Sequence, residues 1–110
     1  MENKPEMMYL MQMETRIVAV LKEIYDPEIP VNVYDLGLIY DVRIDDDNSV
    51  TITMTLTAPN CPIADDIVFS VKSGIEAIDG VKNVTINLVF DPPWSKDMMS
   101  EEALLELGFL

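Results

Sequence analysis

Apolar residues in the first quarter of the chain recur at spacings of three and four. They are Leu10, Met13, Ile17, Leu21 and Ile24. Such spacing places the side chains along one face of a helix, which we expect to begin near Tyr9, with residues 1–8 as a frayed N-terminal segment. Asp26 stands before Pro27, a pair that disfavours further helix.

Two runs of period-two alternation follow, at 38–44 and 50–57. Apolar residues at every second position indicate half-buried strands. The run 45–49 between them is rich in aspartate and contains Asn48, which tolerates a left-handed turn conformation, so the two strands form an antiparallel hairpin. The threonines at 51, 53, 55 and 57 share one face of the second strand, and we expect that face to be solvated.

The remaining pattern predicts a helix, a strand and a short helix. Helical spacing runs from Ile63 to Ile78 and ends at Gly80, a typical helix stop. Alternation over 84–90 indicates a third strand, parallel to the second because the intervening helix crosses over. Ser100, followed by two glutamates, is a good N-cap for a final helix.

These elements define an α+β fold. Each strand has one apolar face, so the helices cover a single side of a small three-stranded mixed sheet in a two-layer sandwich. The expected order is helix-strand-strand-helix-strand-short helix. A chain of 110 residues suits one domain, which we place at residues 9–110.

The net charge of the chain limits the classes of partner that it can bind. Twenty acidic and seven basic residues give a net charge of -13, which makes nucleic acid and anionic membranes poor partners. The N-terminus has neither a signal peptide nor a membrane-spanning pattern. The single cysteine cannot form an internal disulfide and suits a reducing compartment, so we expect a cytoplasmic protein.

That cysteine, Cys61, is the main candidate for chemistry, because it lies between two prolines, where the second predicted strand ends and the next helix begins. Main-chain N–H groups at a helix start favour a thiolate, which binds metals and reacts. The alternative is a buried, inert thiol.

The chain has no histidine to act as the usual base, and one thiol cannot hold an iron–sulfur cluster alone. Any cluster would be transient, or shared with a second chain or a small thiol.

Two further groups of residues are candidates. The long connection after the first helix carries the acids Asp26, Glu28 and Asp35, which suit either metal binding and acid–base roles or ordinary turn hydrogen bonds. Trp94, after two prolines, either plugs the end of the core or anchors a partner protein.

The chain resembles a known family in three stretches of sequence. They are Asp26-Pro27-Glu28, Asp35-Leu36-Gly37-Leu38-Ile39-Tyr40 and Thr57-Ala58-Pro59-Asn60-Cys61-Pro62. In these, and in the order of its elements, it is similar to the SufT and PaaD-like iron–sulfur assembly domains, which are related to the eukaryotic cytosolic iron–sulfur targeting factor. It lacks the cysteine-rich tail of some PaaD-like members, which favours the SufT-like branch.

The resemblance implies a role in assembling iron–sulfur clusters or delivering them to apoproteins. The family's reactive cysteine falls on Cys61, and its acidic positions fall on Asp26, Glu28 and Asp35. Expected partners are scaffold or carrier proteins, client apoproteins, and a second copy of the chain in a homodimer.

Our preferred hypothesis is therefore an accessory factor, not an enzyme, in which Cys61 transiently binds iron or a cluster or contacts a client. Two alternatives stay open: a purely structural adaptor that recruits clients through the sheet face and Trp94, and a PaaD-like maturation factor for a ring-oxidising enzyme complex. An enzyme with Cys61 as nucleophile is disfavoured, because no base or oxyanion-binding set is evident.

Overall fold

The computed structural model describes residues 4–26, 29–57 and 64–109. Its elements follow the expected order, with a three-stranded mixed sheet and three α-helices. They are α1 (Lys4–Leu21), β1 (Ile39–Ile44), β2 (Ser49–Met54), α2 (Ala64–Glu76), β3 (Asn83–Leu88), the short 3-10 helix η1 (Lys96–Met98) and α3 (Glu101–Glu106). The predicted α+β class and element order are confirmed.

The sheet has the strand order β1-β2-β3. β1 and β2 form the antiparallel hairpin, with Val42 opposite Ile52, and its turn contains Asn48 at a φ of 68°. β3 runs parallel to β2, with Ile86 beside Ile52. The helix between them therefore makes the predicted crossover connection.

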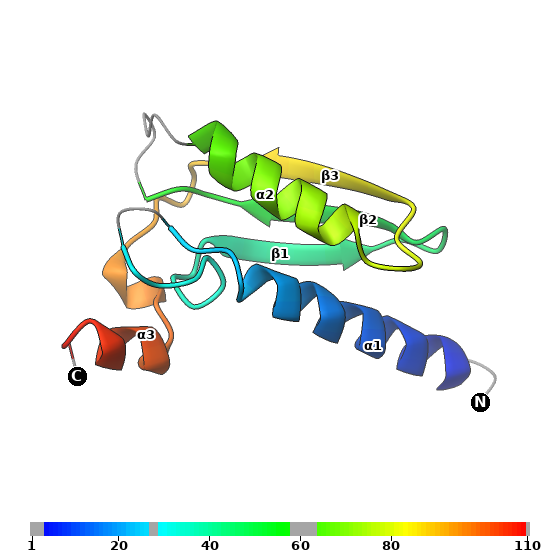
Figure 1. Ribbon diagram of the computed structural model, residues 1–110, viewed down its shortest axis with the longest axis horizontal. Coiled ribbons are helices and arrows are strands. Elements are labelled where there is room, and N and C mark those ends of the chain that lie inside the picture. Colours follow the sequence, from blue (N-terminus) through cyan, green and yellow to red (C-terminus); the bar gives the residue numbers. More distant parts are fainter. Residues whose placement is uncertain (1–3, 27–28, 58–63, 110) are drawn as a thin grey trace.

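The core lies between the sheet and the two longer helices. α1 and α2 contact each other, α1 also contacts β1, and α2 lies against β3 (Figure 1). Each helix buries residues at spacings of three or four, and β2 buries alternate residues, as the sequence pattern predicts. The fully or nearly fully buried side chains of these elements are Met13, Ile17 and Leu21, then Val50, Ile52 and Met54, then Ile67, Val71 and Ile75.

Some local features differ from the expectation. α1 begins at Lys4 rather than near Tyr9, and β3 ends at Leu88, two residues early. The prediction of a solvated threonine face was wrong at one position: Thr55 is fully buried, and among the described residues its hydroxyl has no hydrogen-bond partner. The pattern within a strand shows which residues share a face, but not what covers that face at the strand's end.

The C-terminal segment returns to the connection between α1 and β1. Ser100 caps α3 as predicted, because its hydroxyl accepts the N–H of Ala103 at 3.1 Å. Its own N–H donates to the main-chain oxygen of Asp35 at 2.8 Å. α3 is thereby joined to a segment about 65 residues earlier in the chain, which is the segment that carries the acidic candidates.

Candidate functional site

Asp26 organises the start of that connection. Its side chain is 5% exposed, and its Oδ1 atom accepts the N–H of Ile29 at 3.0 Å. Its main-chain N–H donates to the oxygen of Val31 at 3.2 Å. An aspartate that accepts a main-chain N–H three residues ahead is a turn former, so the structure shows the turn role that the sequence left as one of two options.

Asp35 is held by Asn32. The Nδ2 group of Asn32 donates to the Asp35 carboxylate at 2.8 Å, and the Asp35 N–H donates back to Oδ1 of Asn32 at the same distance. Asn32 also pairs with Tyr25 in an isolated antiparallel bridge. These contacts fix residues 32–35 and hold the Asp35 carboxylate in a defined position.

A polar hollow lies beside Asp35. Its volume is about 280 Å³. Its polar lining includes Lys22, Asn32 and Asp35, together with Glu102 and Glu106 of α3. The structure thus brings acids from two distant parts of the chain to one depression. Sequence reasoning did not include the α3 glutamates, although the contact between Ser100 and Asp35 is what brings them there.

Gly37 allows the C-terminal segment to approach the connection closely. Its φ is +83°, and a Cβ atom at this position would collide with the main-chain carbonyl of Met98. Only glycine meets both demands without strain. The glycine of the Leu-Gly pair in the family motif is therefore explained by the structure, because the main chain at Met98 packs directly against Gly37.

Trp94 both packs and faces outward. Its indole Nε1–H donates to the main-chain oxygen of Leu36 at 2.6 Å, and the half-buried ring packs against the core. It also lines an open apolar hollow of about 420 Å³. The other lining residues are Ile29, Pro30, Lys96, Met99, Leu107 and Phe109. The two roles considered for Trp94, plug and anchor, are therefore compatible in this geometry.

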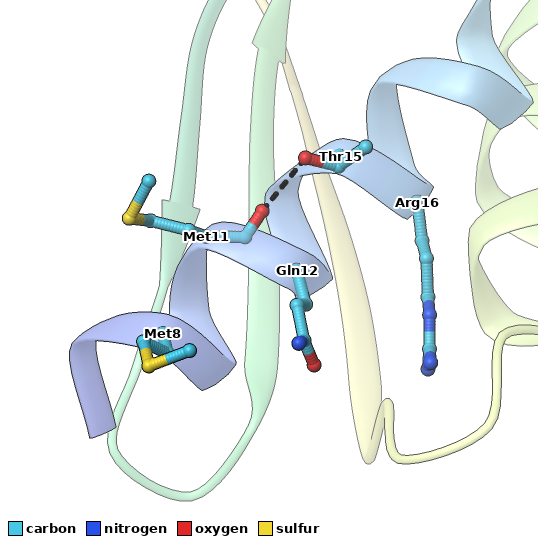
Figure 2. Close-up of a pocket in the computed structure, with 5 residues that line it drawn as sticks. All are labelled: Met8, Met11, Gln12, Thr15 and Arg16. Atoms are coloured by element: carbon cyan, nitrogen blue, oxygen red, sulfur yellow. Dashed lines mark hydrogen bonds between the residues drawn. The ribbon is translucent and has the colours of Figure 1, made fainter. Parts of the chain in front are cut away.

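A second apolar surface lies on the outer face of α1. Met8 and Met11 are 60% and 63% exposed, and with Gln12, Thr15 and Arg16 they line an open hollow of about 450 Å³ (Figure 2). The Thr15 hydroxyl donates a hydrogen bond to the main-chain oxygen of Met11 at 2.9 Å, so its donor is already used within the helix. Flexible methionine side chains are typical of adaptable protein-binding surfaces.

Two predicted site residues, Cys61 and Glu28, lie outside the described residues. In the sequence Cys61 stands between β2 and α2, the two elements that the prediction placed around it. Among residues 4–26, 29–57 and 64–109, no group of three or more histidine, cysteine, aspartate or glutamate side chains is arranged to hold a metal ion. In the same ranges, no helix is long and apolar enough to cross a lipid bilayer.

Comparison with known proteins identifies the family. Residues 14–88 match the model of the iron-sulfur cluster assembly protein family. The chain belongs to this family. A Porphyromonas gingivalis protein named "Fe-S protein maturation auxiliary factor" is 63% identical over 100 residues, covering 91% of this chain and 95% of that protein. The SufT maturation factor of Staphylococcus aureus is 40% identical, covering 77% of this chain and 97% of that one.

The fold of the family is also known from solved structures. A crystal structure of a domain of unknown function from Bacillus anthracis matches with a TM-score of 0.83 and 40% identity, covering 90% of this chain and 94% of that chain.

A PaaD-like relative, named as a putative component of the Escherichia coli 1,2-phenylacetyl-CoA epoxidase, is 33% identical over 88 residues, covering 79% of this chain and 52% of that protein. The resemblance drawn from the sequence motifs, including its SufT-like and PaaD-like branches, is confirmed.

Proposed function

We propose that this protein is a non-catalytic accessory factor in iron–sulfur cluster assembly or delivery, with the cluster or iron as its cargo. The observation that carries the proposal is the near full-length similarity, at 63% identity, to a protein named as an iron–sulfur maturation auxiliary factor. Similarity at this level over 91% of the chain favours a shared role as well as a shared fold.

Cys61 is the residue that we assign to direct contact with cargo or client. It is the only thiol of the chain, and thiolates are the ligands that iron–sulfur clusters prefer. Because one thiolate is too few for a cluster, further ligands come from a client, a second copy of the chain or a small thiol. The contact is therefore transient, as a delivery role requires.

The acidic connection is assigned a supporting role. Asp26 and Asp35 are held by hydrogen bonds within the loop, and Glu28 lies between them in sequence. Carboxylates beside a thiolate oppose a further negative charge, whereas a bound cation relieves that repulsion. We infer that the connection folds towards Cys61, where these acids favour the iron-loaded state of the cysteine over the free thiolate.

The test is the variant Cys61→Ser in the native host, with the activities of several iron–sulfur enzymes measured under iron limitation. Ser70→Ala, on an exposed position of α2, serves as the matched control. We expect enzyme activities to fall with Cys61→Ser and to stay normal with the control. Unchanged activities in the cysteine variant would overturn the assignment of Cys61.

The second candidate function is a structural adaptor that recruits clients without using its thiol. The exposed Met8 and Met11 and the hollow beside Trp94 favour it. Thiol labelling of the folded protein distinguishes the two functions. An inert Cys61, together with undiminished client capture by Cys61→Ser, would favour the adaptor.

A further inference from the structure

The two edges of the sheet are protected very differently. Unpaired strand edges attract other strands, and proteins usually block them with charges, prolines or bulges. The β1 edge has such features, since Asp41 and Arg43 lie on the strand and the pairing register shifts between Ile39 and Asp41. The other edge, β3 (Asn83–Leu88), has no charged residue and no proline, and its register with β2 is continuous.

The free main-chain groups of β3 can be assigned from one hydrogen bond. The N–H of Val89 donates to the oxygen of Met54 in β2 at 2.8 Å. Because successive residues of a strand direct their main-chain groups to opposite edges, the groups of Val84, Ile86 and Leu88 point away from β2. Within the described part of the chain, no loop or helix donates to or accepts from them.

We propose that this edge pairs with β3 of a second copy of the chain, antiparallel and about a two-fold axis at Ile86. In this register Ile86 faces Ile86 of the second copy, and Val84 faces Leu88 at both ends. Each of these pairs exchanges both of its main-chain hydrogen bonds. Shifting the strands by two residues in either direction leaves some of these groups without partners.

Side chains match in the same register. Val84, Ile86 and Leu88 lie on the face that α2 covers, where Val84 is buried but Leu88 is still 37% exposed. Pairing brings Leu88 beside the buried Val84 of the second copy and extends the core across the junction. On the opposite face Thr85 meets Asn87, a polar pair. The strand is thus complementary to itself.

Charge also favours a second copy at this position. The chain carries a net charge of -13, so two copies repel each other over most approaches. β3 is uncharged, and pairing there buries no carboxylate. Since salt screens the remaining repulsion over a Debye length of about 8–10 Å, we expect self-association to strengthen as ionic strength rises. This interface is independent of the proposed function of Cys61.

The register makes a sharp prediction for cysteine cross-linking in a Cys61→Ser background. Thr85 and Asn87 of the two copies are directly opposite in a non-hydrogen-bonded pair, with Cα atoms about 4.5 Å apart, within reach of a disulfide. The diagonal distance between identical positions is about 7–8 Å, which is too long. A mixture of Thr85→Cys and Asn87→Cys should therefore form several-fold more covalent dimer than either variant alone.

Arg43→Cys and Asp41→Cys, on the β1 edge, serve as controls and should give only background cross-linking. Circular dichroism checks that each variant is folded. Sedimentation equilibrium of the unmodified protein should show a dimer that strengthens with protein and salt concentration. Equal cross-linking in the mixture and in the single variants, or a monomer at all concentrations, would overturn the proposal.

Discussion

The hydrogen bond from Trp94 to Leu36 should contribute measurably to stability. Leu36 is fully buried, and its carbonyl oxygen accepts the indole N–H at 2.6 Å. In Trp94→Phe most of the apolar ring remains but the donor is lost. A buried carbonyl left without a partner costs about 1–3 kcal/mol. For a domain of this size each kcal/mol lowers the melting temperature by about 4 °C.

Tyr40→Phe is the matched control. The Tyr40 hydroxyl donates to the oxygen of Pro92 at 2.7 Å, but that bond is exposed to solvent. Water can replace the lost donor, so the cost should stay below about 1 kcal/mol. Both variants remove one donor that ties residues 92–94 to residues 36–40, and they differ mainly in the burial of the acceptor.

The assay is urea and thermal unfolding followed by circular dichroism, with the slope of the urea transition checked for two-state behaviour. We expect Trp94→Phe to melt roughly 4–12 °C below the unmodified protein, and Tyr40→Phe to melt only slightly below it. Equal losses in the two variants would refute the argument from the buried carbonyl.

Three further predictions concern other positions. Gly37→Ala should destabilise the fold by at least about 3 kcal/mol, because strain at positive φ adds to a main-chain collision. Gly108 has the same φ of +83° but open space around it, so Gly108→Ala should cost about 1–2 kcal/mol. Urea unfolding measures both losses of stability. Thr55→Val should raise stability by about 1 kcal/mol, since it removes a buried hydroxyl that has no partner within residues 4–26, 29–57 and 64–109; a loss of stability in urea unfolding would contradict this. Hydrogen bonds from Ser49 lower the pKa of Asp47 from its ordinary value. A lowered folded-state pKa adds stability that is present above the unfolded pKa and is lost as pH falls through the folded value. An NMR titration of the Asp47 carboxyl should therefore have its midpoint below the ordinary aspartate pKa, and Asp47→Asn should remove that part of the acid-induced loss of stability.

Much of the fold could be predicted because the relevant signals are local. Alternation defined the hairpin, the spacing from Ile63 to Ile78 indicated the crossover helix, and a crossover helix makes β3 parallel to β2. Ser100 was identified as a cap from its own side chain and its neighbours. Each of these signals depends on residues within a few positions of one another.

The details of the candidate site depend on contacts between distant segments. The sequence allowed a turn role for Asp26 and Asp35 as one of two interpretations. Asn32 lies three residues before Asp35, and this spacing could have identified it as the hydrogen-bond partner of Asp35. The approach of α3 to Asp35 could not be predicted, because it depends on a hydrogen bond between residues about 65 positions apart. Thr55 was misplaced for the same reason, since burial at the end of a strand is set by the packing of the whole chain.

The bond between Trp94 and Leu36 also provides an optical reporter. Trp94 is the only tryptophan of the chain, and its indole group contacts the main chain one residue after Asp35. Indole emission responds to hydrogen bonding and to the polarity around the ring. A movement of the acidic connection when iron, a cluster or a client binds should therefore change the intrinsic fluorescence of the unlabelled protein.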